Sequence, residues 1–211
     1  MRKTNYLAVF TLAVSMLFVS CEQQNDAVVA QDEVSESVLA ALTNAGFDVT
    51  QQAPIKFDDG YLVEGDIYIP AADLASLKEG TRLAVEEQYS TNNLVSTGGS
   101  RTITMYAPEG GKNGYSAGMI AGLDLAISRY NAQNLAISFQ RVTSSNNADI
   151  VMTRLSKRDE RQGVLGSAGF PTSSGDPYGQ IKMSGILESS YGLSTGGIAT
   201  IIAHEMGHCI G

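Results

Sequence analysis

The sequence predicts a mixed α/β fold of the α+β type, in which a small β-rich region precedes a larger domain. Of its 211 residues, 43% are hydrophobic and 17% are charged, which suits one sizeable core or two small ones. Strand-like alternation and helical periodicity succeed one another beyond residue 100. A stretch rich in Ser, Thr, Asn and Gly separates that part from the residues before it, so we expect a linker there.

The first twenty residues have the features of an export signal. Arg2 and Lys3 precede an apolar run over residues 6–19, which is too short for a comfortable membrane span. The run leads into Leu-Phe-Val-Ser-Cys, which resembles a bacterial lipobox, so we expect residues 1–20 to be removed and Cys21 to carry lipid. The protein would then lie in the cell envelope, anchored to a membrane through that lipid. The alternative is an ordinary secretory signal followed by an incidental cysteine.

The part between the signal and residue 100 is expected to hold a tether and a small folded region. Polar and acidic composition predicts the tether, spacing of three and four residues predicts a helix, and alternation predicts strands. In chain order we expect a tether over 21–33, a helix from Val34 that stops at Gly46, a β-rich stretch over Tyr61–Pro70, one or two helical turns over Ala71–Leu77, and a linker over 89–100. We place a domain boundary at this linker, between residues 34–100 and residues 101–211.

Residues 101–211 are expected to form the larger domain. Its first helix carries apolar residues on one face, and its last helix has Ser194 or Thr195 as N-cap. A segment rich in Gly, Pro and Ser precedes the last helix and is typical of an irregular edge strand. In chain order we expect a strand over Arg101–Ala107, a helix over Ser116–Asn131, strands over Ala136–Val142 and Ala148–Leu155, the edge segment over Leu165–Met183, and the final helix.

Charge and cysteine content narrow the function classes. The formal net charge is −8 and no run of more than two basic residues occurs, so no large cluster is available to neutralise nucleic-acid phosphates. We therefore expect no nucleic-acid partner. Cys21 and Cys209 are the two cysteines, and lipid on Cys21 would leave no intramolecular disulfide.

The end of the final helix carries the motif H-E-x-x-H. His204 and His208 are four residues apart, so on a helix both imidazoles lie on one face and can reach one metal ion, with Glu205 beside it. Zinc is the expected metal, and Glu205 is the expected general base that takes a proton from water during hydrolysis of a peptide bond. The alternative is a solvated helix face whose two histidines bind no metal.

Gly211 points to a longer motif. Metzincins carry H-E-x-x-H-x-x-G-x-x-H, in which the glycine ends the helix and turns the chain so that a third histidine meets the metal. In this chain the third ligand would fall three residues beyond Gly211, so we expect a C-terminally incomplete catalytic domain whose own activity is in doubt. The alternative is a thermolysin-like zincin, in which a downstream Glu is the third ligand.

The chain resembles the bacterial dual-action HEIGH metallopeptidases, a lipoprotein-rich metzincin family. The likeness rests on Cys21 behind its signal, on the motif at His204–His208, and on three further stretches: Tyr61–Ile67, Tyr130–Ala132 and Gly166–Pro171. Met206 replaces the Ile of the family name, an apolar exchange. The resemblance implies a metzincin-like zincin fold and a zinc-dependent peptidase, with His204 and His208 as ligands, Glu205 as base, and peptides or proteins as substrates.

Glu64-Gly65-Asp66-Ile67 is similar to the motif of astacin-type pro-segments in which an aspartate binds the zinc and blocks it. A carboxylate is a competent zinc ligand, and the preceding glycine lets backbone enter a tight cleft. We therefore expect residues 34–100 to be a pro-like region of a zymogen, with Asp66 as latency ligand and the 89–100 linker as activation site. The alternative is an acidic strand residue that faces solvent.

The edge segment before the final helix is expected to bind substrate. An exposed strand edge takes up an extended peptide through main-chain hydrogen bonds. We assign this role to Gly166, Ser167, Ala168 and Gly169; an ordinary surface loop is the alternative. For the whole chain, the alternative function from a different class is that of a non-catalytic surface-binding lipoprotein on a zincin scaffold. Such a protein would not need Glu205.

Overall fold

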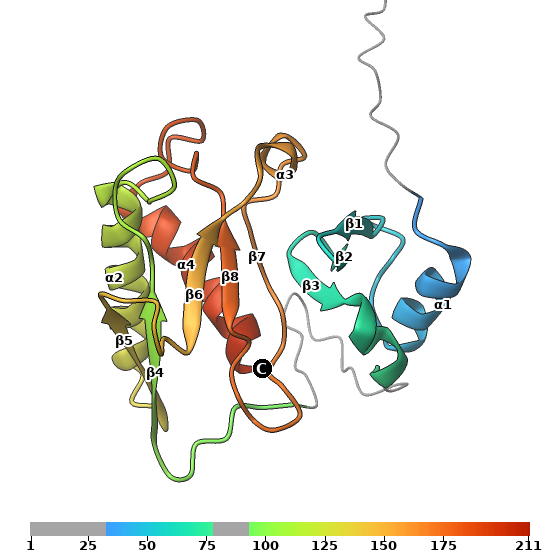
Figure 1. Ribbon diagram of the computed structural model, residues 1–211, viewed down its shortest axis with the longest axis horizontal. Coiled ribbons are helices and arrows are strands. Elements are labelled where there is room, and N and C mark those ends of the chain that lie inside the picture. The colour runs from blue at the N-terminus through green and yellow to red at the C-terminus, as the bar shows by residue number, and fades with distance from the viewer. Residues whose placement is uncertain (1–32, 78–92) are drawn as a thin grey trace, which may run out of the picture. The chain divides into compact units, whose positions relative to one another are not determined.

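The computed structural model describes residues 33–77 and 93–211 (Figure 1). The expected signal at 1–20, the lipid site at Cys21, nearly all of the tether and the first part of the 89–100 linker lie outside the described residues. Within the described ranges, no helix combines the length and the apolar character that crossing a membrane requires.

The described residues form a mixed α/β structure, as the composition and periodicity predicted. The helices are α1 (Glu36–Asn44), the 3-10 helix η1 (Ala71–Ser76), α2 (Ala117–Asn131), α3 (Lys157–Arg161) and α4 (Thr195–Ile210). The strands are β1 (Ile55–Phe57), β2 (Gly60–Val63), β3 (Ile67–Pro70), β4 (Arg101–Tyr106), β5 (Ile137–Val142), β6 (Ile150–Arg154), β7 (Gly166–Ala168) and β8 (Gln180–Met183). The expected elements are present within a few residues, with one correction: the predicted edge segment Leu165–Met183 contains two strands, β7 and β8, and β8 lies inside the sheet between β7 and β6.

The strands of the described residues join in one sheet with the order β1-β2-β3-β7-β8-β6-β4-β5. Strands β8, β6, β4 and β5 run parallel, whereas β7 is antiparallel to β8. At the other end, β1, β2 and β3 form an antiparallel meander whose last strand pairs with β7 in parallel. The strands before and after the predicted linker therefore share a sheet.

The stretch Tyr61–Pro70 is a hairpin rather than one continuous β-run. Glu64 and Gly65 both adopt positive φ, at 54° and 96°, and this turn reverses the chain so that Val63 faces Ile67. Gly65 adopts its positive φ with little conformational strain, because a residue with a Cβ is strained at such angles. Asp66 is the last residue of this turn and directly precedes β3.

Helices α2 and α4 pack side by side against the sheet and enclose the main core (Figure 1). The predicted apolar face of α2 is buried, and the Ser116 Oγ accepts a hydrogen bond from the Met119 backbone N–H at the helix N-terminus. Three side chains of α4 spaced four residues apart, Ile198, Ile202 and Met206, are buried on the same core. This packing fixes the rotation of α4 and with it the direction of the histidines.

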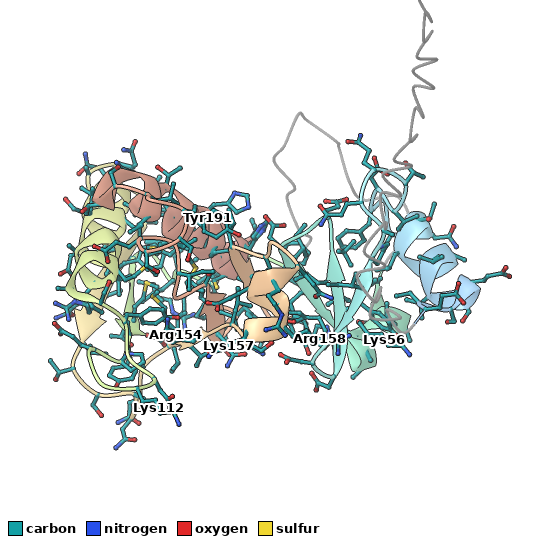
Figure 2. All side chains as sticks on the ribbon, turned by 90° about the horizontal axis from the view of Figure 1, so that it is seen from above. Lys56, Lys112, Arg154, Lys157, Arg158 and Tyr191 are labelled. Carbon is teal, nitrogen blue, oxygen red and sulfur yellow. The ribbon has the colours of Figure 1, made fainter. Side chains whose placement is uncertain are left out.

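The short helix α3 was not predicted. It has five residues with no apolar face, and Lys157 and Arg158 project from it into solvent (Figure 2). Its start is set by Ser156, whose side chain accepts a hydrogen bond from the backbone N–H of Asp159. A capping residue alone was too weak a signal without periodicity behind it.

Candidate metal centre

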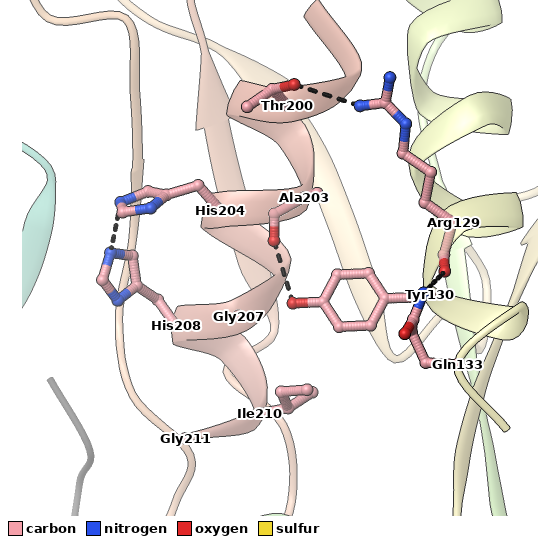
Figure 3. A pocket seen from close by; sticks show the side chains of 10 residues that line it. All are labelled: Arg129, Tyr130, Gln133, Thr200, Ala203, His204, Gly207, His208, Ile210 and Gly211. Atoms are coloured by element: carbon pink, nitrogen blue, oxygen red, sulfur yellow. Dashed lines mark hydrogen bonds between the residues drawn. The ribbon is translucent and has the colours of Figure 1, made fainter. Parts of the chain in front are cut away.

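Helix α4 places the two motif histidines on one face. Its N-cap is Ser194, as predicted, with the Ser194 Oγ accepting a hydrogen bond from the backbone N–H of Gly197. The Nε2 atoms of His204 and His208 lie 3.1 Å apart and the ring centroids 4.6 Å apart (Figure 3). The two imidazoles therefore direct their nitrogen atoms to one place, as the spacing of four residues predicted.

Asp66, in the turn directly before β3, meets the two histidines. Its Oδ2 atom lies 2.7 Å from Nε2 of His204 and 3.8 Å from Nε2 of His208. Burial alone would raise the pKa of Asp66, but hydrogen bonds and charge from the two histidines outweigh it and lower that pKa to about 2. The same hydrogen bond raises the pKa of His204 against the opposing effect of its burial. Residues 138 positions apart in sequence thus form one polar cluster.

These three side chains fit a divalent metal ion. One ligand atom from each of Asp66, His204 and His208 lies within 4.8 Å of the other two. Two imidazole nitrogens and one carboxylate oxygen are a donor set that zinc takes in proteins. Cys209, one residue from His208, is not part of this group: it is fully buried in the core, where burial raises the pKa of its thiol well above the usual value.

Glu205 is buried beside the cluster. Its side chain is 1% exposed, and its Oε2 atom has no hydrogen-bond partner among the described residues. Burial, and then the charge of Asp66, raise the pKa of Glu205 well above its ordinary value. A buried carboxylate oxygen without a partner is costly, and strongly shifted carboxyl groups gather at functional sites. Glu205 is thus the acid-base candidate of the cluster.

Gly166 gives Glu205 its space. A Cβ atom added to Gly166 would lie 2.3 Å from Oε1 of Glu205 and 2.8 Å from its Cδ, well inside contact distance. Gly166 begins β7 and is buried. The glycine at this point of the edge strand therefore sets where the Glu205 carboxylate rests.

The predicted substrate edge is strand β7, and in this structure β3 occupies it. Ile67 of β3 lies opposite Ala168, and the backbone N–H of Ala168 donates to the carbonyl of Asp66 at 3.2 Å. Ser167 and Ala168 belong to β7, and Gly169 follows with its Cα close to the ring of Tyr178. Gly166–Ala168 therefore form a strand, Gly169 lies outside it, and residues of the N-terminal region pair with this strand.

A cavity of about 560 Å³ opens beside the histidines, between α2 and α4 (Figure 3). Tyr130 donates a hydrogen bond from its hydroxyl to the carbonyl of Ala203, and Arg129 donates to the Thr200 hydroxyl. The volume of this cavity is in the range of sites that bind small ligands or single side chains in proteins. The lining residues Arg129 and Gln133 carried no motif, and only the packing of α2 on α4 brings them to the histidines.

Comparison with known proteins identifies the chain. No curated protein matches it. The family described as dual-action HEIGH metallo-peptidase matches residues 61–211, which include the β3 segment with Asp66, the edge strand β7 and the whole of α4. Because this match covers well over half of the sequence and contains the cluster just described, the chain belongs to the dual-action HEIGH metallo-peptidase family and is a metallopeptidase in class.

Proposed function

We propose that the protein is a zinc-dependent peptidase of the metzincin type, in which His204 and His208 hold the metal and Glu205 is the general base. The observation that carries the proposal is the convergence of the two Nε2 atoms, 3.1 Å apart, next to a buried carboxylate on the same helix. When bound, zinc would supply Lewis-acid chemistry, polarising a peptide carbonyl and making a water molecule easier to deprotonate. Peptides or proteins are the substrates.

The role of Glu205 follows from its position between the two ligands in sequence and from its surroundings. A carboxylate with an unpartnered oxygen is free to accept a proton from water and to pass it to the leaving amine. Burial, and then the charge of Asp66, raise the pKa of Glu205, so its carboxylate takes up a proton more readily than an exposed one does. In this mechanism the two histidines hold the metal in position, and Glu205 transfers the proton.

We further propose that residues 34–100 are an inhibitory pro-like region. Two contacts support this: Asp66 is the third member of the ligand group, and β3 covers the edge of β7 where a substrate strand would bind. Each contact blocks a different part of a peptidase site, the metal and the substrate backbone. Cutting the 89–100 linker would allow this region to leave, so the uncut chain is a zymogen.

The proposal extends to location. The signal-like residues 1–20 and the lipobox-like cysteine Cys21 support a lipid anchor in the cell envelope. Metabolic labelling with a radioactive fatty acid tests this: Cys21→Ser should abolish the label, and Cys209→Ser should retain it. Label that persists in the Cys21→Ser variant would contradict a lipid anchor on Cys21.

The test of function is metal removal. The full-length gene product, cut in its linker, should bind about one zinc per chain and hydrolyse casein, because the two histidines and a third ligand make a zinc site. Treatment with a chelator should abolish hydrolysis, and added zinc, but not magnesium, should restore it, since imidazole nitrogens favour zinc over magnesium. Zinc content is measured by atomic absorption on the same samples. A protein that hydrolyses casein equally well after complete metal removal would contradict the proposal.

Replacing Asp66 with Ala tests latency. The uncut variant should hydrolyse casein at least about tenfold faster than the uncut parent, because a hydrogen bond to a charged group contributes roughly 1.5–3 kcal/mol to the closed state. Asp73→Ala is the matched control, since it removes an exposed carboxylate from the same region and should leave latency intact. If the cut parent is active and the uncut Asp66→Ala variant stays as silent as the uncut parent, Asp66 is not the latency ligand.

A further inference from the structure

We propose that Ser167, Tyr178, Gln180 and Lys182 form a subsite that takes an aromatic side chain of an extended peptide bound on the edge of β7. In the described chain, Tyr68 of β3 fills this place. The inference rests on the proposed function, because the substrate peptide must replace β3. It adds a substrate class to that function: peptides with an aromatic residue at a fixed distance from the residue at the metal.

Strand β3 lies on β7 as an added peptide would. It is extended, it pairs in register through Ile67 and Ala168, and the Ala168 N–H donates to the Asp66 carbonyl. At the same time the Asp66 side chain reaches His204 at 2.7 Å. One short segment therefore satisfies both the strand edge and the candidate metal site, the two places that an extended substrate would occupy.

Tyr68 lies two residues after Asp66 and packs with Ser167, Gln180 and Lys182. These three side chains alternate along β7 and β8 with residues of the core under α4, so Tyr68 lies on the face of the sheet opposite to α4. The Tyr68 side chain is 8% exposed, and its ring centroid lies 6.1 Å from that of Tyr178, with the planes tilted by 53°. Tilted pairs at this distance are favourable for aromatic rings. Phe57 lies on the other side of Tyr68, 6.0 Å away and tilted by 59°. Tyr68 is thus held between two rings.

The walls of this place come from two parts of the chain. Six side chains pack together at this place: Phe57 and Tyr68 from the N-terminal region, and Ser167, Tyr178, Gln180 and Lys182 from the part that carries α4. The backbone of the last four belongs to β7, β8 and the segment between them, although the Lys182 side chain also pairs with Asp58 of the N-terminal region. Ser167 is in β7, Gln180 and Lys182 are in β8, and the Tyr178 backbone N–H donates to the Cys209 carbonyl of α4 at 3.0 Å. Departure of β1–β3 would leave an open site with these four walls.

The chemistry of the walls suits an aromatic ring. Tyr178 offers a ring face or edge, and the small side chain of Ser167 leaves room above the strand. Lys182 already places its Nζ atom 5.1 Å from the ring centroid of Phe57, besides its ion pair with Asp58. A lysine ammonium over a ring is attracted to the ring face. Tyr or Phe would satisfy all three contacts, and Ala would satisfy none.

The experiment uses the full chain cut in its linker and loaded with zinc. Quenched fluorescent peptides that differ in one position, as Tyr, Phe, Leu or Ala, are compared by kcat and KM, and that position is moved along the peptide. At one position, peptides with Tyr or Phe should have a kcat/KM at least about tenfold higher than the peptide with Ala. The difference should lie mainly in KM, because burial of the ring strengthens substrate binding. Ser167→Val, which fills the site from below, should reduce the preference to under about threefold, and Ser138→Val on β5 should keep it. Peptides cleaved equally well whatever the residue would overturn the subsite.

A second readout needs no hydrolysis. In the uncut chain, Tyr68→Ala leaves a ring-sized cavity, and p-cresol should raise the Tm of this variant progressively as its concentration increases, as ligands of engineered apolar cavities do. It should not raise the Tm of the parent or of Tyr191→Ala, since Tyr191 is 45% exposed (Figure 2). The Tyr68→Val variant, which leaves a smaller cavity, is tested with p-cresol in the same way. Stabilisation by p-cresol in a protein that cleaves no peptide would keep the subsite and reject the proposed function; no stabilisation of either variant would reject the subsite.

Discussion

Replacing Glu205 with Gln is expected to lower kcat of the cut, zinc-loaded protein by roughly 10²- to 10⁴-fold, the usual contribution of a general acid-base group. Gln has nearly the same shape, so the packing against Gly166 and the helix stays intact. It cannot accept and return a proton in the range where a carboxylate does. Kinetics on one peptide, together with zinc content, separate loss of the base from loss of the metal.

Folding of the Glu205→Gln variant should be unimpaired. The exchange removes a buried carboxylate whose Oε2 atom has no partner in the described part of the chain, and a neutral amide costs less to bury than a charge. The Tm should therefore stay at or above that of the parent. Glu109→Gln is the matched control, because the Glu109 side chain is 60% exposed and lies away from the cluster. A Glu205→Gln variant with full zinc and parental kcat would remove Glu205 from the mechanism.

Gly166→Ala is expected to have the second large effect. The added methyl would lie 2.3 Å from Oε1 of Glu205, so either the carboxylate or strand β7 has to move. Misplacing a catalytic group by about 1 Å costs on the order of 10²-fold in rate. Overpacking of a buried site also costs about 1–3 kcal/mol of stability. We expect kcat to fall by about that rate factor and Tm to decrease, with KM changed little.

A double substitution shows whether the loss acts through Glu205. Glu205→Asp shortens the side chain by one methylene and makes room for the new methyl, so Gly166→Ala with Glu205→Asp should be more active and more stable than Gly166→Ala alone. A merely structural role for Gly166 would show no such rescue. Gly179→Ala is the control, because a Cβ there would lie 3.6 Å from its nearest neighbour, an ordinary contact. Parental kcat in Gly166→Ala would mean that the strand yields and that Glu205 keeps its place.

Local sequence signals predicted the elements well because they report local structure. The buried face of α2, the Ser194 cap and the spacing of His204 and His208 depend on helix geometry, which a chain fixes within a few residues. The turn at Glu64 and Gly65 was missed because alternation of apolar residues continues on both sides of it. Alternation identifies strands but does not show where one ends and the next begins.

By itself, the sequence determined the mixed α/β class and named the candidate ligands His204 and His208 and the candidate base Glu205, since their motif lies on one helix. Asp66 was a candidate only through its resemblance to a pro-segment motif. Its contact with His204 depends on the pairing of β3 with β7, which joins residues about a hundred positions apart. The space above Gly166 and the place of Tyr68 also exist only in the folded chain. Such contacts are decided by sheet order and helix packing, and no periodicity or spacing in a sequence encodes which edge a strand will join.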